Sequence, residues 1–249
     1  MSVKIDKQEA KKTDALTKEL KKGFEWTQAH SQIVVILILS FLVIGGGTAA
    51  YQYTQDQKEV ELQSQFFAAE KAFLEKRASL EMAENPPPPG SEMPAVKPQK
   101  STGDMNQDYG STLQPLQSLL EQSPQSKAAK MSALYLAETH LNYKKPTEAV
   151  GFLKKVDSST KDLLSGLVKY QLGTALADAQ NCSEAVQTWS QVIASKESSF
   201  LHPQAKLKQA LCYEALGDKA QAQKLLEEVS SLKDSQIAET ATKYLRLVQ

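Results

Sequence analysis

The residue types that most often carry chemistry are scarce in this sequence. Three histidines and two cysteines are too few for a standard four-ligand zinc site unless widely separated residues converge. The sequence contains no GxSxG, HExxH, P-loop or GxGxxG motif. The adjacent acids Glu227 and Glu228 are interpreted as solvated surface, because a paired-carboxylate site needs two acids placed across a cleft. We therefore expect no enzyme activity, no catalytic residues, no metal site and no cofactor.

The charge balance argues against a nucleic-acid partner. Lys plus Arg number 29 and Asp plus Glu number 29, so the formal net charge is zero, whereas nucleic-acid binders present a basic surface. Only two of the cations are arginines, Arg77 and Arg246, so a guanidinium-rich phosphate-binding face is not expected. Hydrophobic residues at 41% and charged residues at 23% are typical of a folded protein.

A single uncharged stretch near the N-terminus predicts a transmembrane helix, which would contact membrane lipid. Residues 33–50 contain no charged side chain, and this length lies near the lower end of the range that spans a bilayer. Trp26 precedes the stretch and Tyr51 and Tyr53 follow it, as suits residues at the two membrane–water interfaces.

Lysines flank this stretch unequally. The 20 residues before it contain three lysines, and the 20 residues after it contain one. By the positive-inside rule, we expect residues 1–32 to form a cytoplasmic segment and the C-terminal part to lie across the membrane. A cleaved signal peptide is the alternative, because residues 45–50 are small. We favour an uncleaved signal anchor, since the 32 preceding residues exceed an ordinary n-region.

Residues 51–84 are expected to form an amphipathic helix. An apolar stripe recurs at helical spacing within 56–84 and consists of Leu62, Phe66, Ala69, Phe73 and Leu80. Barely three heptads are present and Lys76 interrupts the stripe, so a coiled coil is disfavoured. We expect Phe66, Phe73 and Leu80 to dock onto the downstream domain, with self-association through residues 56–84 as the alternative.

Residues 85–110 are rich in proline. Six prolines and few bulky apolar side chains predict neither a core nor a regular helix. We interpret this segment as an extended, semi-rigid linker.

Residues 111–249 contain an internal repeat. The tetrapeptide TEAV at 147–150 recurs as SEAV at 183–186, 36 residues later, and a third copy follows after 37 more. Small residues recur in each copy, with an alanine twelve positions further on: Ala137, Gly173 and Ala210, followed by Ala149, Ala185 and Ala222.

These positions resemble the tetratricopeptide-repeat (TPR) pattern over about residues 127–232. The resemblance implies a TPR-like α-solenoid of about three helix pairs plus capping helices. Together with the one transmembrane helix predicted from residues 33–50, this gives an all-α protein. Leu113, Leu116, Leu119 and Leu120 are expected on the second helix of a partial pair whose first helix is 56–84. Residues 234–248 are expected to close the array.

In the TPR family the first helices of successive pairs line a concave groove that binds protein partners. The family's groove positions correspond to eleven residues of this sequence, hereafter the predicted groove face: Met131, Leu134, Glu138, Asn142, Leu167, Tyr170, Thr174, Asp178, Leu207, Leu211 and Glu214. The basic clamp with which some members hold a peptide carboxylate is missing. We therefore expect the face to bind a helix or an unfolded segment. The alternative is that the stripe of Phe66 and Phe73 fills it from within the chain.

The two cysteines fall on neighbouring pairs in this arrangement. Cys182 is expected in the inter-helix turn of the second pair and Cys212 on the first helix of the third. Stacked pairs could bring them together, and an oxidising compartment would permit a disulfide. Two isolated cysteines 30 residues apart are more often unpaired, and the geometry decides.

The order of elements is similar to that of the ancillary SecYEG translocon subunit family. This resemblance implies a single-pass bacterial inner-membrane protein with a periplasmic C-terminal domain. It also implies a non-enzymatic adaptor whose partners are the Sec translocon, periplasmic chaperones or exported proteins. The Pro-rich segment 85–110 departs from that family's pattern. The alternative is a self-associating envelope scaffold for cell division or outer-membrane maintenance.

Overall fold

The part of the chain that the structure describes is mainly helical. The computed structural model describes residues 7–86, 96–159, 162–232 and 235–248. Every regular element in these ranges is a helix, which confirms the all-α class. The chain divides into two compact units, Met1–Lys58 and Glu59–Gln249.

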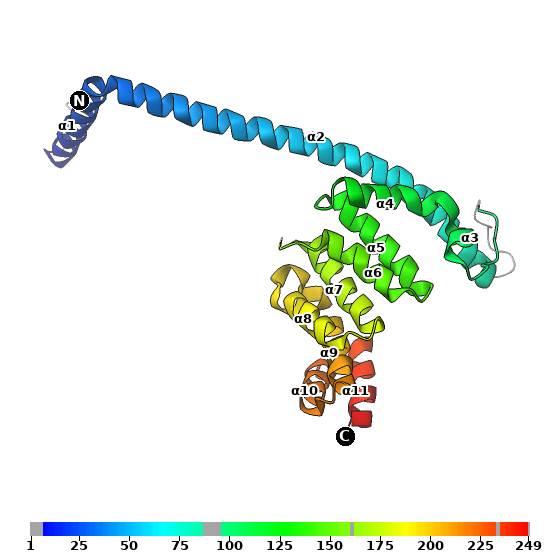
Figure 1. Ribbon diagram of the computed structural model, residues 1–249. Helices are drawn as coiled ribbons and strands as arrows, with labels where there is room; N and C mark the ends of the chain where they lie inside the picture. Colours follow the sequence, from blue (N-terminus) through cyan, green and yellow to red (C-terminus); the bar gives the residue numbers. More distant parts are fainter. Residues whose placement is uncertain (1–6, 87–95, 160–161, 233–234, 249) are drawn as a thin grey trace, which may run out of the picture. The chain divides into compact units, whose positions relative to one another are not determined.

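The first unit contains helix α1 (Lys7–Ala29) and the first part of helix α2 (Ser31–Glu84) (Figure 1). Helix α2 is long and apolar enough to cross a membrane, with an 18-residue window of mean hydropathy 2.5 that is not buried. A signal sequence near the N-terminus would have the same length and hydropathy. Separate helices were expected at 33–50 and 51–84; instead, one continuous helix covers both ranges.

The second unit is built from successive helix pairs. Helix α5 (Lys127–Asn142) packs on α6 (Pro146–Val156), α7 (Leu163–Asp178) on α8 (Cys182–Ala194), and α9 (His202–Ala215) on α10 (Lys219–Ser230). Figure 1 shows these pairs in order from green to orange. The 3-10 helix η2 (Lys196–Leu201) joins the second pair to the third. Helix α11 (Gln236–Val248) packs on α10 and α9 and closes the array.

The three pairs turn through the same backbone conformation. A left-handed residue follows the first helix of each pair: Lys144, Gln180 and Gly217, with φ of 57°, 63° and 84°. The following amide then bonds back to the helix, as in Asn181 N to Leu176 O at 2.8 Å. This is the Schellman geometry, which satisfies carbonyls that the helix end would leave unpaired. Only one of the three residues is glycine, the residue type that adopts this left-handed conformation without steric cost.

The part of α2 within the second unit packs onto the following helices through its apolar stripe. Helix α4 (Leu113–Gln122) belongs to the same hydrophobic cluster. Phe66, Phe73 and Leu80 are buried in one cluster with Leu116 and Leu120 of α4. The apolar stripe of 56–84 is therefore docked inside the chain.

Residues 96–110, hereafter the strap, connect α2 to α4 and include helix α3 (Met105–Tyr109). Ser79 of α2 donates from Oγ to the Lys97 carbonyl at 2.6 Å and accepts the Gln99 amide at its own carbonyl at 2.9 Å. The Tyr109 ring stacks on Phe73 with centroids 5.3 Å apart. The expectation of a linker without regular structure over 85–110 is therefore wrong for the strap. Residues 87–95 lie outside the described residues.

A buried carboxylate fixes the strap to the first full pair. Asp108 is inaccessible to solvent. It accepts bonds from Ser101 Oγ at 2.6 Å, from Thr102 N and Oγ1 at 2.8 Å each, and from Tyr143 Oη at 2.6 Å. Burial alone would raise the pKa of this carboxyl, but the four donors outweigh burial and lower the pKa well below its ordinary value. The residue is therefore a charged anchor between the strap and the α5–α6 turn.

The second pair has a close helix crossing. A Cβ atom placed on Gly173 would lie 2.5 Å from Nε1 of Trp189. Trp189 is only 1% exposed and its Nε1 donates to the Tyr170 carbonyl at 3.2 Å. The indole therefore lies against bare backbone, which explains why this crossing uses glycine where the other two pairs have alanine.

Candidate partner-binding face

The predicted groove face is a row of accessible side chains on neighbouring helices. Three of its members are exposed and lie near the ends of α5, α7 and α9: Asn142, Asp178 and Glu214. The other eight are half-buried: Met131, Leu134, Glu138, Leu167, Tyr170, Thr174, Leu207 and Leu211. Helix α7 contacts both α5 and α9, so the three helices present their equivalent positions in succession.

The apolar members pack at their bases against the core. Met131, Leu134, Leu167 and Tyr170 contact the main hydrophobic cluster, and Leu207 contacts the smaller cluster of the third pair. Burial raises the pKa of the Tyr170 phenol, so it remains a neutral donor at physiological pH. Fixed apolar side chains with acids at one edge suit an apolar segment that also carries basic residues.

Helix α2 occupies one end of this face. Arg77 donates from both terminal nitrogens to the two carboxylate oxygens of Glu138, each at 3.0 Å, and from Nε to Glu81 at 2.7 Å. Hydrogen bonds to Glu81 and Glu138 raise the pKa of this guanidinium further above its ordinary value, despite the opposing effect of burial. Glu138 is therefore an intramolecular partner of α2.

Tyr135 is a second contact between α2 and α5, and the sequence pattern missed it. Its ring lies 5.1 Å from that of Phe73 and 6.1 Å from that of Phe66. Its hydroxyl donates to Glu70 at 2.7 Å. Burial, together with this bond to a carboxylate, raises the pKa of Tyr135 to about 12. The nearest signal in the sequence was its position beside Leu134, one of the residues assigned to the face.

A cavity of about 550 Å³ adjoins the face at Asn142. The last turns of α2, the strap and the α5–α6 turn line it, through residues that include Arg77, Glu81, Glu84, Ser101, Tyr109 and Lys144. Both charge signs are present, and Arg77 is already paired with two carboxylates. The cavity therefore adds a polar, accessible surface next to the predicted groove face.

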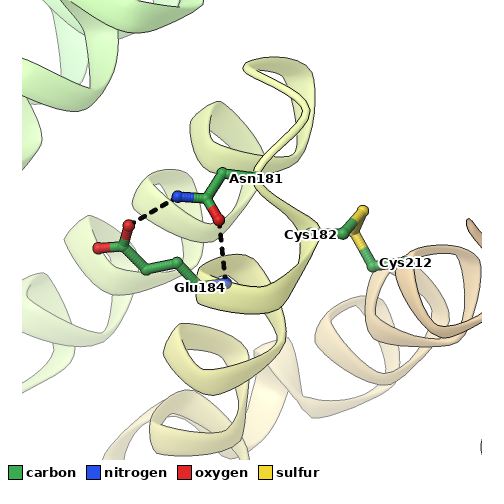
Figure 2. The surroundings of a disulfide bond; sticks show 4 residues. All are labelled: Asn181, Cys182, Glu184 and Cys212. Carbon is green, nitrogen blue, oxygen red and sulfur yellow. Dashed lines mark hydrogen bonds between the residues drawn. A yellow bond between two sulfur atoms is a disulfide. The ribbon is translucent and has the colours of Figure 1, made fainter. Parts of the chain in front are cut away.

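The two cysteines form a disulfide between neighbouring pairs. Cys182 is the first residue of α8 and bonds to Cys212 of α9, with Cα atoms 5.1 Å apart (Figure 2). Beside it, Asn181 caps α8 by accepting the Glu184 amide, and its own amide donates to the Glu184 carboxylate. The sequence left this pairing open and favoured unpaired cysteines; the stacking of α8 on α9 brings the two residues together. The bond fixes the second pair against the third, and with it the spacing of Tyr170 and Leu207.

The described residues show no arrangement typical of metal binding. No group of three or more His, Cys, Asp or Glu residues in those ranges is placed to hold an ion. His140 is buried against Phe152 and its Nδ1 lies 2.7 Å from the Leu136 carbonyl. Burial lowers the pKa of this imidazole, so His140 is a neutral packing residue.

Comparison with known proteins identifies one repeat directly. Residues 204–232 match the tetratricopeptide repeat family model; this range contains most of α9 and all of α10. No match was found among curated proteins. The tetratricopeptide repeat indicates an adaptor or scaffold for protein–protein interaction.

Three solved structures are similar to this chain. A crystal structure of MamA protein has 22% sequence identity, a TM-score of 0.46, and an alignment that covers 59% of this chain and 76% of that one. A second crystal structure of MamA has 20% identity and a TM-score of 0.44, covering 60% and 94%. A structure of MamA MSR-1 C2 has 16% identity and a TM-score of 0.43, covering 74% and 98%.

Proposed function

We propose that this protein is a membrane-anchored, non-enzymatic adaptor that binds protein partners on the predicted groove face. The observation that carries the proposal is the row of half-buried apolar side chains on α5, α7 and α9, within helix pairs that include a tetratricopeptide repeat. Such a surface buries apolar area when a helix or an unfolded segment lies along it.

The proposed location is the bacterial inner membrane, with the repeat unit in the periplasm. Three observations support it: the apolar N-terminal part of α2, the excess of lysines before that part, and the disulfide. Structural disulfides persist in oxidising compartments and are rare in the cytosol. The proposed partners are the Sec translocon, periplasmic chaperones and exported chains, on the basis of the similar order of elements in the ancillary translocon subunits.

Self-association through Phe66 and Phe73 is not proposed. Both side chains are buried in the hydrophobic cluster of the repeat unit, and both contact Tyr135 of α5 within one chain. A dimer that used them would have to undock α2 from the repeat unit and expose this apolar surface to water.

Acidic substitutions on the face should weaken partner binding. In full-length tagged protein isolated from native membranes, we expect Tyr170→Asp combined with Leu207→Asp to lower co-isolated partner proteins about tenfold. Such a loss corresponds to roughly 1.4 kcal/mol of binding free energy. The matched control is Gln187→Asp combined with Lys224→Asp, at exposed positions on α8 and α10.

The control should retain the wild-type partners, and thermal unfolding should show that both double variants are folded. Equal partner recovery from a folded Tyr170→Asp, Leu207→Asp protein would contradict the assignment of this face.

A further inference from the structure

Helix α1 has an apolar stripe that nothing in the repeat unit explains. Leu20 and Phe24 lie four residues apart in Lys7–Ala29, so they share one side of the helix. In the sequence, Leu16 continues the same spacing. The side chains of Leu20 and Phe24 are 66% and 65% exposed. At 100° per residue, Thr17 and Gly23 flank this line of side chains, one on each side. The apolar side is therefore narrow, about three turns long and open to an external partner.

The remaining surface of α1 is polar and predominantly basic. The helix contains six lysines and four acidic residues. At 100° per residue, Lys18 and Lys22 lie on the side opposite Leu20, and Lys21 lies at the border of the two sides. Lysines at the border and on the polar side, with Leu and Phe on the other, are the pattern of helices that lie in a membrane interface. Long lysine side chains reach headgroups while their stems cover apolar surface.

The junction with α2 places this helix next to an apolar segment. α1 ends at Ala29 and α2 begins at Ser31, so only His30 separates them. The Trp26 ring stacks on His30 with centroids 4.9 Å apart and an interplanar angle of 23°. Tryptophan favours the boundary between water and acyl chains. If the apolar part of α2 crosses a bilayer, the C-terminal end of α1 is held at the bilayer surface.

We propose that α1 lies in the plane of an anionic lipid surface. Leu20 and Phe24 then enter the boundary of the acyl chains, and the lysines contact phosphate headgroups. A second copy of the helix fits less well, because a coiled coil needs an apolar seam over three or four heptads. A lipid surface accepts a short, narrow stripe and complements the positive charge. The inference rests on the proposed membrane span and extends it to the lipid composition of the cytoplasmic leaflet.

The test uses full-length protein in lipid nanodiscs with an environment-sensitive fluorophore on a single introduced thiol. The native cysteines are paired, so labelling without reductant is selective. The matched positions are Leu20→Cys on the apolar side and Lys18→Cys on the polar side. In phosphatidylcholine with phosphatidylglycerol, we expect quenching by spin-labelled lipid to be several-fold stronger at position 20 than at position 18. Replacing Lys18, Lys21 and Lys22 with glutamine, with the label kept at position 20, should weaken that quenching.

A third label at Phe41→Cys, in the middle of the apolar part of α2, tests the span separately. If lipid quenches the label at position 41 while positions 18 and 20 are equally exposed to water, the inference about α1 is overturned and the membrane span is retained. Equal water exposure at all three positions would overturn the membrane span and this inference together. Protection at position 20 that depends on protein concentration rather than on phosphatidylglycerol would identify a second copy as the partner and also overturn the inference.

Discussion

Replacing Asp108 with asparagine is expected to lower the free energy of unfolding of the repeat unit by about 2–4 kcal/mol. The carboxylate is inaccessible to solvent and accepts four hydrogen bonds from Ser101, Thr102 and Tyr143. An asparagine amide keeps one acceptor oxygen and turns a nitrogen toward groups that donate to the native residue. Since the bonds join the strap to the α5–α6 turn, thermal unfolding of the full-length protein in detergent should show the loss.

The matched control for this prediction is Asp104→Asn in the same strap. Asp104 caps α3 from an exposed position by accepting the amides of Asn106 and Gln107. Asparagine caps helices about as well as aspartate does, so the control should unfold close to the wild type. Equal unfolding temperatures for Asp108→Asn and Asp104→Asn would show that the buried carboxylate contributes little.

The pH dependence of the Asp108 effect has a defined sign. Its folded-state pKa is lowered, so its stabilisation is complete above the ordinary aspartate pKa of about 3.9 and declines as the pH falls below that value. The difference in stability between the wild type and Asp108→Asn should therefore be constant from about pH 5 to 7 and shrink below about pH 4. A difference that grew on acidification would contradict this account.

Replacing Gly173 with alanine is expected to destabilise the second helix pair by about 1–3 kcal/mol, although alanine is the better helix former. The added Cβ would lie 2.5 Å from Nε1 of Trp189. The indole is 1% exposed and bonded to the Tyr170 carbonyl, so it has no free space into which it can move. The unfolding temperature should fall by roughly 2–4 °C for each kcal/mol in a unit of this size.

Gly151→Ala is the matched control for Gly173→Ala. Gly151 is an exposed residue in α6, and its added Cβ would meet nothing within 4 Å. Alanine should therefore raise stability there by up to about 1 kcal/mol through helix propensity. Combining Gly173→Ala with Trp189→Phe should also cost less than the sum of the two single changes, because the smaller ring makes room for the methyl group. Strict additivity would mean that the two sites do not touch.

Most of the repeat unit was predicted from helix periodicity and from the spacing of small residues. Each helix pair buries one apolar stripe and crosses at a small residue, so the positions of Gly173, Ala149 and Ala185 indicated which helices meet. The apolar stripe of Phe66 and Phe73 also predicted that this part of the chain docks onto the repeat unit, where both side chains are buried. Such patterns report contacts between elements that repeat at a fixed spacing in the sequence.

The strap and the disulfide could not be predicted in the same way. All prolines of segment 85–110 lie at or before Pro98. The composition averaged over the whole segment therefore gave no indication that residues 99–110 include a helix. Asp104 before Met105 is a helix-capping signal that would have marked α3. No local signal marks Asp108 as buried, because its donors include Tyr143, 35 residues away. The disulfide likewise depends on how α8 stacks on α9, which the spacing of Cys182 and Cys212 does not specify.

The predicted groove face has the least support from sequence alone. Its residues were assigned by position within the repeat, and the structure places eight of the eleven in half-buried positions. It also pairs Glu138 with Arg77, a contact that depends on how α2 docks. Periodicity locates such a face, whereas the partner depends on side-chain chemistry that a repeat pattern does not encode.

The most direct test of the adaptor function is photo-crosslinking in native membranes from reporters at Tyr170 and Leu207, with a reporter at Gln187 of α8 as the control. Mass spectrometry would identify the crosslinked chains. We predict that Tyr170 and Leu207 crosslink to translocon subunits, chaperones or many exported proteins, and that Gln187 does not. Crosslinks from Tyr170 and Leu207 only to residues 59–84 of the same protein would contradict the account, because the face would then be filled by its own α2 helix.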